Sequence, residues 1–174
     1  ERVSLPGLLE CPGITEWEGR ALSEAEVRAE YLDGDPRLTR CLVYRDGHPL
    51  GYLQFFRYEE EAWRAAVGLS QAEDAWGIDL FLADPADRGR GLGTRLLAGT
   101  LARLAEERGA RLVLIDPLVD NPRAIACYRR AGFVPRRVIP AHEEQAGVPK
   151  DALLMEWRPS GPAALPKGSD GARL

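Results

Sequence analysis

The run Arg88-Gly89-Arg90-Gly91-Leu92-Gly93 has the residue types that bind a phosphate group. It lies between an apolar, strand-like run at 77–83 and a helical pattern at 94–108. Glycines at a strand-to-helix turn let backbone N–H groups close on an anion, and the start of the helix adds a partial positive charge. The two arginines add formal charge. This turn therefore predicts a site for a polyphosphate-like ligand, with a simple tight turn as the alternative.

The spacing within this turn differs from the common nucleotide-binding loops. A dinucleotide fold requires Gly-x-Gly-x-x-Gly with an acidic residue about 20 positions later. A P-loop requires Gly-Lys followed by Ser or Thr, and this chain has no such triplet at the turn. The observed spacing is Arg88-x-x-Gly91-x-Gly93, which leaves a pyrophosphate clamp of the acetyl-CoA type.

A second motif, in the segment 121–133, follows the pattern N-x-x-A-x-x-x-Y-x-x-x-G-F. Together with R/Q-x-x-G-x-G/A at the turn, it resembles the GNAT family of acetyl-CoA-dependent N-acetyltransferases over about residues 38–157. Within that family the chain is most similar to aminoglycoside 6′-N-acetyltransferases. The segments that carry this narrower resemblance are Thr15-Glu16-Trp17-Glu18-Gly19, Gly77-Ile78-Asp79, Arg88 to Thr94, Asp116-Pro117, Asn121 and Cys127-Tyr128.

The resemblance implies a fold and a co-substrate. The fold is α/β (α+β): a mixed, mostly antiparallel sheet with a central parallel strand pair splayed around acetyl-CoA, and helices on both faces. The co-substrate is acetyl-CoA, and no metal is required. A free backbone N–H of Phe81 or Leu82 is implied as the oxyanion donor. The implied cofactor-binding residues are Phe81, Leu82, Ala83, Arg88, Gly89, Arg90, Gly91, Leu92, Gly93, Thr94, Asn121, Ala124 and Tyr128.

The resemblance also implies roles for four side chains. Asp79 is the general base, Tyr128 protonates the leaving thiolate, and Trp17 and Asp116 contact the substrate. Because an ordinary Asp pKa near 4 is low for a base, we expect burial and a nearby acid to raise it. The alternatives are a buried Asp79–arginine salt bridge, a turn cap at Asp116, and simple packing of Tyr128 against the sheet.

The acidic residues of the chain indicate the class of acceptor molecule. Asp79, Asp116, Asp120 and the acidic segment 58–75 are expected to make the acceptor side negative, which suits a polyamine-like sugar or another cationic amine. The first expectation is therefore an aminoglycoside amine. The alternatives are a hydroxylated lysine in siderophore assembly, a protein or peptide amine, and an acyl-CoA sensor without an acceptor.

Composition excludes several other classes of protein. The net charge of −4 argues against a nucleic-acid partner. The chain has no apolar run of bilayer length and no signal-peptide pattern, so we expect a cytoplasmic protein without a membrane partner, either a monomer or a homodimer. Cys11, Cys41 and Cys127 are expected to be lone thiols. Neither His48, in an expected turn, nor His142 has the Cys/His spacing of a zinc site.

Local patterns predict one domain at 1–158 and a disordered tail at 159–174. The segment 58–75 is expected to be irregular. Trp63 and Trp76 are expected to pack in the core or at its edge, with the lining of a pocket as the alternative. Only the strands that alternate with helices are expected to pair in parallel. The predicted elements are a helix capped by Ser23 and Glu26, strands at 38–45 and 50–57 around an Asp46-Gly47 turn lengthened by His48 and Pro49, a strand at 77–83, a helix at 94–108 stopped by Gly109, a strand at 111–116, a helix from Asn121-Pro122 to before Gly132, and strands at 133–139 and 151–157.

Overall fold

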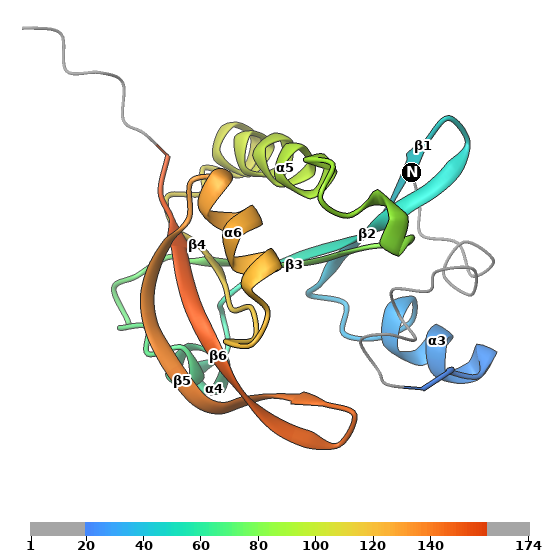
Figure 1. The fold of residues 1–174 in the computed structure, drawn as a ribbon. Coiled ribbons are helices and arrows are strands. Elements are labelled where there is room, and N and C mark those ends of the chain that lie inside the picture. Colours follow the sequence, from blue (N-terminus) through green and yellow to red (C-terminus); the bar gives the residue numbers. More distant parts are fainter. Residues whose placement is uncertain (1–19, 160–174) are drawn as a thin grey trace, which may run out of the picture.

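The computed structural model describes residues 20–159 as a six-stranded sheet with helices on both faces (Figure 1). The strand order is β1-β2-β3-β4-β6-β5. The predictions for Trp17 and its segment 15–19 concern residues outside this range. The same holds for the predicted tail 159–174, except for Pro159. In chain order the elements are α3 Glu24–Tyr31, β1 Thr39–Arg45, β2 His48–Arg57, α4 Glu61–Ala66, β3 Trp76–Leu82, a 3-10 turn Pro85–Asp87, α5 Leu92–Arg108, β4 Val113–Ile115, α6 Pro122–Arg130, β5 Val134–Gln145 and β6 Val148–Trp157.

Helix ends follow the expected capping chemistry. Ser23 and Glu26 form a reciprocal capping box at the start of α3. The Asn121 side chain accepts a hydrogen bond from the Ala124 N–H at 3.1 Å, and Pro122 begins α6. Gly109 ends α5 with a φ of 68°, a conformation that glycine adopts without strain. These starts and stops confirm the predicted helices. None of the helices in residues 20–159 is long and apolar enough to cross a membrane.

The first hairpin is tighter than expected. Asp46 and Gly47 have φ values of 53° and 81°, which is the backbone of a two-residue type I′ turn. His48 already pairs with Arg45, so the expected lengthening of the turn is wrong. The register shifts between Val43 and Tyr44, and this irregularity accommodates Pro49 inside the strand.

The central strand pair separates soon after it forms. β3 and β4 are parallel, as predicted, and their registered pairs are Trp76–Val113 and Gly77–Leu114. On its other side β3 pairs antiparallel with β2 along its whole length. The second half of β3 therefore has one edge that β4 does not cover, which leaves an opening between the two strands.

Three apolar clusters cover the two faces of the sheet. On one face, α5 and α6 pack on strand residues such as Ile78 and Met155, with Leu97, Leu101 and Leu104 buried along α5. Full burial stabilises by roughly 2 kcal/mol per leucine. The opposite face carries two smaller clusters, under α3 and α4, which include Tyr31, Tyr52, Tyr58, Val67 and Leu154. Helices on both faces confirm the expected layers.

Two elements differ from the sequence-based expectation. The segment 58–75 contains the helix α4, whereas Trp63 on it lies partly buried against the edge of a core cluster, as expected. Trp76 packs against the α5–α6 core, as expected. The late strand β5 continues to Gln145 instead of ending at Ile139, and it pairs with β6 beyond a bulge.

Candidate active site

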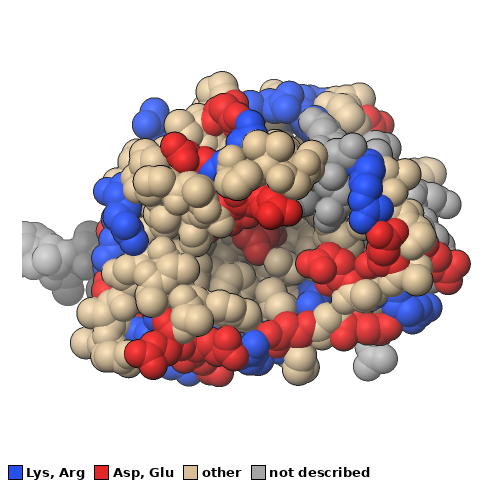
Figure 2. Space-filling model, turned by 90° about the horizontal axis from the view of Figure 1, so that it is seen from below, with Lys and Arg blue, Asp and Glu red and all other residues tan. Residues whose placement is uncertain are grey.

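A cavity of about 650 Å³ opens where β3 and β4 separate. Its walls come from the second half of β3, the chain after β4, the N-terminus of α5, α6, and the far part of β5. The space-filling view shows a hollow with acidic side chains in and around it (Figure 2). The cavity thus joins the two faces of the sheet through the opening between the strands.

The glycine-rich turn supplies a set of free backbone donors. Gly89 and Gly91 have φ values of 73° and 75°, so the chain turns sharply before α5. The first intrahelical bond runs from the Arg95 N–H to the Gly91 carbonyl at 3.1 Å. By helix geometry, the N–H groups of residues 92–94 have no partner within the helix. They lie at the positive end of a 17-residue helix and can bind a pyrophosphate.

The two arginines of this turn point to different surroundings. Arg88 lines the cavity. Arg90 instead forms an ion pair with Asp87, at 3.3 Å, and Arg45 from the hairpin approaches the same carboxylate at 3.0 Å. Asp87 is the buried charged residue of the described chain, and its two guanidinium partners compensate its charge.

Strand alternation identifies which backbone N–H faces the opening. The Ala83 N–H bonds to Leu50 on β2, whereas the Trp76 N–H bonds to Leu112 on the β4 side. Because N–H directions alternate along a strand, the Leu82 N–H points to the opening and the Phe81 N–H to β2. Of the two donors that the family resemblance offered, Leu82 is the one that faces the cavity.

The helix α6 completes the donor side of the cavity. Asn121, Ala124 and Tyr128 all line it. α6 lies close to α5. A Cβ atom added to Gly93 on α5 would lie only 3.2 Å from the Sγ atom of Cys127 on α6. Burial raises the pKa of the Tyr128 phenol well above its ordinary value, so this side chain stays protonated at neutral pH.

Asp79 projects from β3 on the opposite face and has a neutral partner. The Gln54 Nε2 donates to its Oδ2 at 2.8 Å, and Tyr52 donates to the Gln54 Oε1 at 2.9 Å. The partner of Asp79 is therefore an amide, not the arginine of the alternative interpretation. Burial and, to a smaller extent, the charge of Asp116 raise the pKa of Asp79 to about 6, although the hydrogen bond from Gln54 lowers it. A base with this pKa is largely ionised at neutral pH.

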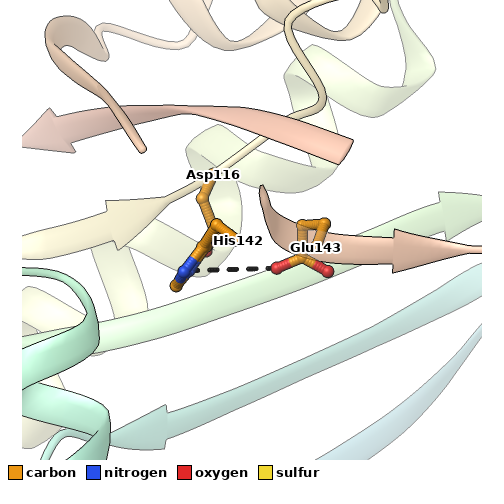
Figure 3. A group of neighbouring side chains, drawn as sticks. All are labelled: Asp116, His142 and Glu143. Atoms are coloured by element: carbon orange, nitrogen blue, oxygen red, sulfur yellow. Dashed lines mark hydrogen bonds and ion pairs between the residues drawn. The ribbon is translucent and has the colours of Figure 1, made fainter. Parts of the chain in front are cut away.

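Three more titratable groups of the same cavity, Asp116, His142 and Glu143, lie side by side (Figure 3). The His142 Nε2 lies 3.0 Å from the Asp116 Oδ2 and 4.0 Å from the Glu143 Oε1. The hydrogen bond to Asp116 raises the pKa of His142. Burial and the charge of Asp116 raise the pKa of Glu143 to about 7. Asp116 therefore contacts a histidine instead of capping a turn.

Sequence reasoning missed His142 and Glu143 because a bulge redirects them. The register of β5 against β6 shifts between Ile139 and Glu143, and Ala141 has a φ of 50°. The Asp151 carboxylate fixes the bulge by accepting from the Ala141 N–H at 2.9 Å. In a regular strand, neighbouring side chains point to opposite faces, whereas here both line the cavity. Pro140 inside an otherwise strand-like run is the signal that could have indicated the bulge.

The negative charge of the cavity has a different origin from the expected one. Acidic side chains of the segment 58–75 form surface ion pairs, such as Asp74 with Arg57 at 2.8 Å. Asp120 pairs with Lys150 at 2.9 Å and lies outside the cavity lining. The carboxylates that line the cavity are those of Glu30, Asp79, Asp87, Asp116 and Glu143, and those of Asp79, Asp116 and Glu143 influence one another electrostatically.

Most of the predicted site residues meet in this one cavity. Ala83 lies in the core under α3 instead, the Arg90 side chain turns to Asp87, and Trp17 is outside the described residues. Trp63, for which lining a pocket was the alternative to core packing, also lines the cavity, as do Gln54 and Tyr58, which no motif marked. The predicted residues that line it are Asp79, Phe81, Leu82, Arg88, Gly89, Gly91, Leu92, Gly93, Thr94, Asp116, Asn121, Ala124 and Tyr128.

Known proteins resemble this chain both in sequence and in architecture. Aminoglycoside N(6′)-acetyltransferases type 1 of Klebsiella pneumoniae and Serratia marcescens are each 30% identical over 135 residues, which is 69% of this chain and 62% of theirs. The chain thus spans about three fifths of their length. The aminoglycoside acetyltransferase AAC(6′)-Ib with coenzyme A and kanamycin superposes with a TM-score of 0.68, at 25% identity, over 91% of this chain and 93% of that one.

An acetyl-CoA complex of AAC(6′)-Ib gives the same TM-score, 0.68, at 27% identity, over 89% of this chain and 88% of that one. The family model described as acetyltransferase (GNAT) domain matches residues 9–140. That match includes the glycine-rich turn, the β3–β4 opening and the whole of α6. The chain belongs to the GNAT acetyltransferase family.

Proposed function

We propose that this protein transfers the acetyl group of acetyl-CoA to a primary amine of a cationic small molecule, the 6′-amine of aminoglycosides. One observation carries the proposal: the backbone donors of α5 and the carboxylate of Asp79 approach one cavity from opposite faces of the sheet. A thioester and an amine bound on these two sides would meet at the opening between β3 and β4. Holding both reactants together supplies much of the rate acceleration.

The transfer needs three groups besides the clamp. Asp79 takes a proton from the acceptor ammonium, directly or through a water, and the free amine attacks the thioester carbonyl carbon. The Leu82 N–H stabilises the oxyanion of the tetrahedral intermediate. As the C–S bond breaks, Tyr128 gives its proton to the leaving thiolate, and the second proton that the attacking nitrogen loses restores the Tyr128 phenol. An amide and a free thiol result, with no acyl-enzyme intermediate.

The acceptor class follows from charge and from relatives. Three carboxylates in one cavity attract an acceptor with several ammonium groups. Two relatives are named aminoglycoside N(6′)-acetyltransferases, and one solved neighbour holds kanamycin. The sequence similarity to these relatives and the shared architecture support the same acceptor here.

The proposed setting follows from the same features. The enzyme acts in the cytoplasm, where acetyl-CoA is available, as a monomer or homodimer. Its partner is a small cationic amine, and neither nucleic acid nor membrane takes part. A net charge of −4 and the acidic cavity support this choice of partner.

Thiol release tests the proposal directly. Purified protein is mixed with acetyl-CoA and kanamycin or ribostamycin, and free coenzyme A is measured against a reaction without acceptor. We expect acceptor-dependent release with one acetyl group added per thiol. Release at the background level with a panel of aminoglycosides would exclude the proposed acceptor class. Retained binding of acetyl-CoA would then favour a sensor.

A further inference from the structure

Tyr58 carries a buried hydroxyl group that no described residue engages. The residue is only 7% exposed and lines the cavity. Within residues 20–159 no side chain or backbone group hydrogen-bonds to its phenol oxygen, whereas the phenol of Tyr52 on β2 donates to Gln54. Buried polar groups nearly always have a partner, because leaving one unpaired is costly. The Tyr58 hydroxyl is therefore available to a bound molecule.

The backbone of Tyr58 is fixed on both sides, which fixes the direction of its ring. The N–H donates to the Ala75 carbonyl at 2.9 Å, and the carbonyl accepts from the Arg64 Nη1 at 2.7 Å. The ring packs against Phe56, with 5.1 Å between ring centroids, and belongs to the apolar cluster under α4. Apolar contacts thus hold the ring, and its hydroxyl end is left to face the cavity.

The surroundings of this hydroxyl determine which ligand group it can bind. Burial and, to a smaller extent, the charges of Asp116, Asp79 and Glu143 raise the pKa of the phenol well above its ordinary value, so it stays a neutral O–H group. A hydroxyl of the ligand can accept from this O–H and donate its own proton to a carboxylate. An ammonium group has no lone pair with which to accept. The Tyr58 O–H therefore favours a hydroxyl group over an ammonium group.

We propose that Tyr58 is a specificity-determining residue, whose O–H donates to a hydroxyl group of the acceptor close to the amine that is acetylated. This inference rests on the proposed function and narrows its substrate class to amino sugars, as opposed to amines without a hydroxyl group. Such amines can still meet the carboxylates of the cavity, but they leave the Tyr58 O–H without a partner.

Tyr58→Phe tests the inference, because it removes only the phenol oxygen. The two acceptors are kanamycin B and 3′,4′-dideoxykanamycin B, which share every amino group and differ in two hydroxyls on the ring that bears the 6′-amine. The preference for kanamycin B is measured as the ratio of the two kcat/KM values. This ratio should fall about fivefold in Tyr58→Phe, the effect of one hydrogen bond between neutral groups. An unchanged ratio would overturn the proposal.

The ratio separates recognition of a hydroxyl from a structural defect. A distorted cavity, or a contact between Tyr58 and an amine common to both acceptors, would lower the two kcat/KM values equally, and that result would also overturn the proposal. Tyr44→Phe is the matched control, because Tyr44 on β1 loses the same oxygen outside the cavity lining. It should leave the ratio within about twofold of the wild type, and an equal fall in both variants would contradict a specific role for Tyr58.

Two further measurements complete the test. The melting temperature of Tyr58→Phe, without acceptor, should equal or exceed that of the wild type, because the change removes an unpaired buried hydroxyl. A lower melting temperature would mean that the hydroxyl has a partner inside the protein, and it would overturn the proposal. Wild-type turnover of kanamycin B tests the proposed function separately. Turnover with an unchanged ratio would reject the role of Tyr58 alone, whereas turnover of neither acceptor would reject the proposed function and this inference with it.

Discussion

The donor and acceptor halves of the cavity are built in opposite ways. The donor half comes from two short stretches of chain, the turn 88–94 and the helix 121–130, and much of it is backbone. The acceptor half consists of side chains from four places: Gln54 on β2, Asp79 on β3, Asp116 after β4 and Glu143 on β5. A compact donor site can be recognised from local sequence, whereas an assembled acceptor site depends on strand register. We therefore expect mutations in the two halves to separate cleanly in their effects.

The largest effect is expected in the acceptor half at Asp79. Asp79→Asn keeps the size of the side chain and removes the base, so kcat should fall by about 10²- to 10⁴-fold. The Kd of acetyl-CoA, measured by calorimetry, should stay within about twofold. Asp120→Asn is the control, because that carboxylate pairs with Lys150 outside the cavity. Comparable kcat values for the two variants would remove Asp79 from the role of base.

The matching change in the donor half is Gly91→Val. Gly91 has a φ of 75°, a backbone conformation that a β-branched residue adopts only at a cost of about 1–3 kcal/mol. The backbone donors should be displaced, so we expect the Kd of acetyl-CoA to rise at least about tenfold with little change for the acceptor. Gly99→Ala within α5, where added atoms meet open space, should leave both constants unchanged. Unchanged binding of acetyl-CoA to Gly91→Val would contradict the clamp.

A substitution at Gln54 tests the acceptor half through the pH dependence of kcat/KM. Its amide donates to the ionised Asp79, so it lowers the pKa of that carboxyl, and Gln54→Leu should raise this pKa above about 6. A base works when deprotonated. The acidic limb of kcat/KM should therefore move to higher pH, with a loss of about tenfold at pH 6 and a smaller loss at pH 8. Tyr52→Phe leaves the donor in place and should shift the limb less. An unmoved limb in Gln54→Leu would exclude this coupling.

The smallest expected effect is on stability. The folded protein raises the pKa of Glu143 to about 7, so above its ordinary pKa the folded chain holds a proton that the unfolded chain has released. This contribution to the free energy of unfolding is present at low pH and is lost as pH rises through about 7. Urea unfolding should show that stability falls less between pH 5 and pH 8 in Glu143→Gln, by on the order of 2 kcal/mol. An identical fall in both proteins would contradict the raised pKa.

The same contrast explains what the sequence could predict. The turn at Arg88, the cap at Asn121 and the stop at Gly109 are local features, and each appears in the structure where its chemistry requires. The partners of Asp79 and Asp116 are Gln54 and His142, which lie 25 and 26 positions away in the chain. Strand pairing and a bulge bring them together, and no local pattern encodes the register. The helix α4 was missed because its single turn and a half carries no cap bond.

Initial-rate kinetics of kanamycin acetylation test the central claim most directly, that both reactants meet in one cavity. Rates are measured over a grid of acetyl-CoA and kanamycin concentrations, and the product is located by NMR. We predict intersecting double-reciprocal lines, one coenzyme A per acetyl group, and the acetyl group on the 6′-nitrogen. Parallel lines with an acetylated protein intermediate, or the absence of an N-acetyl product, would contradict direct transfer between the two halves.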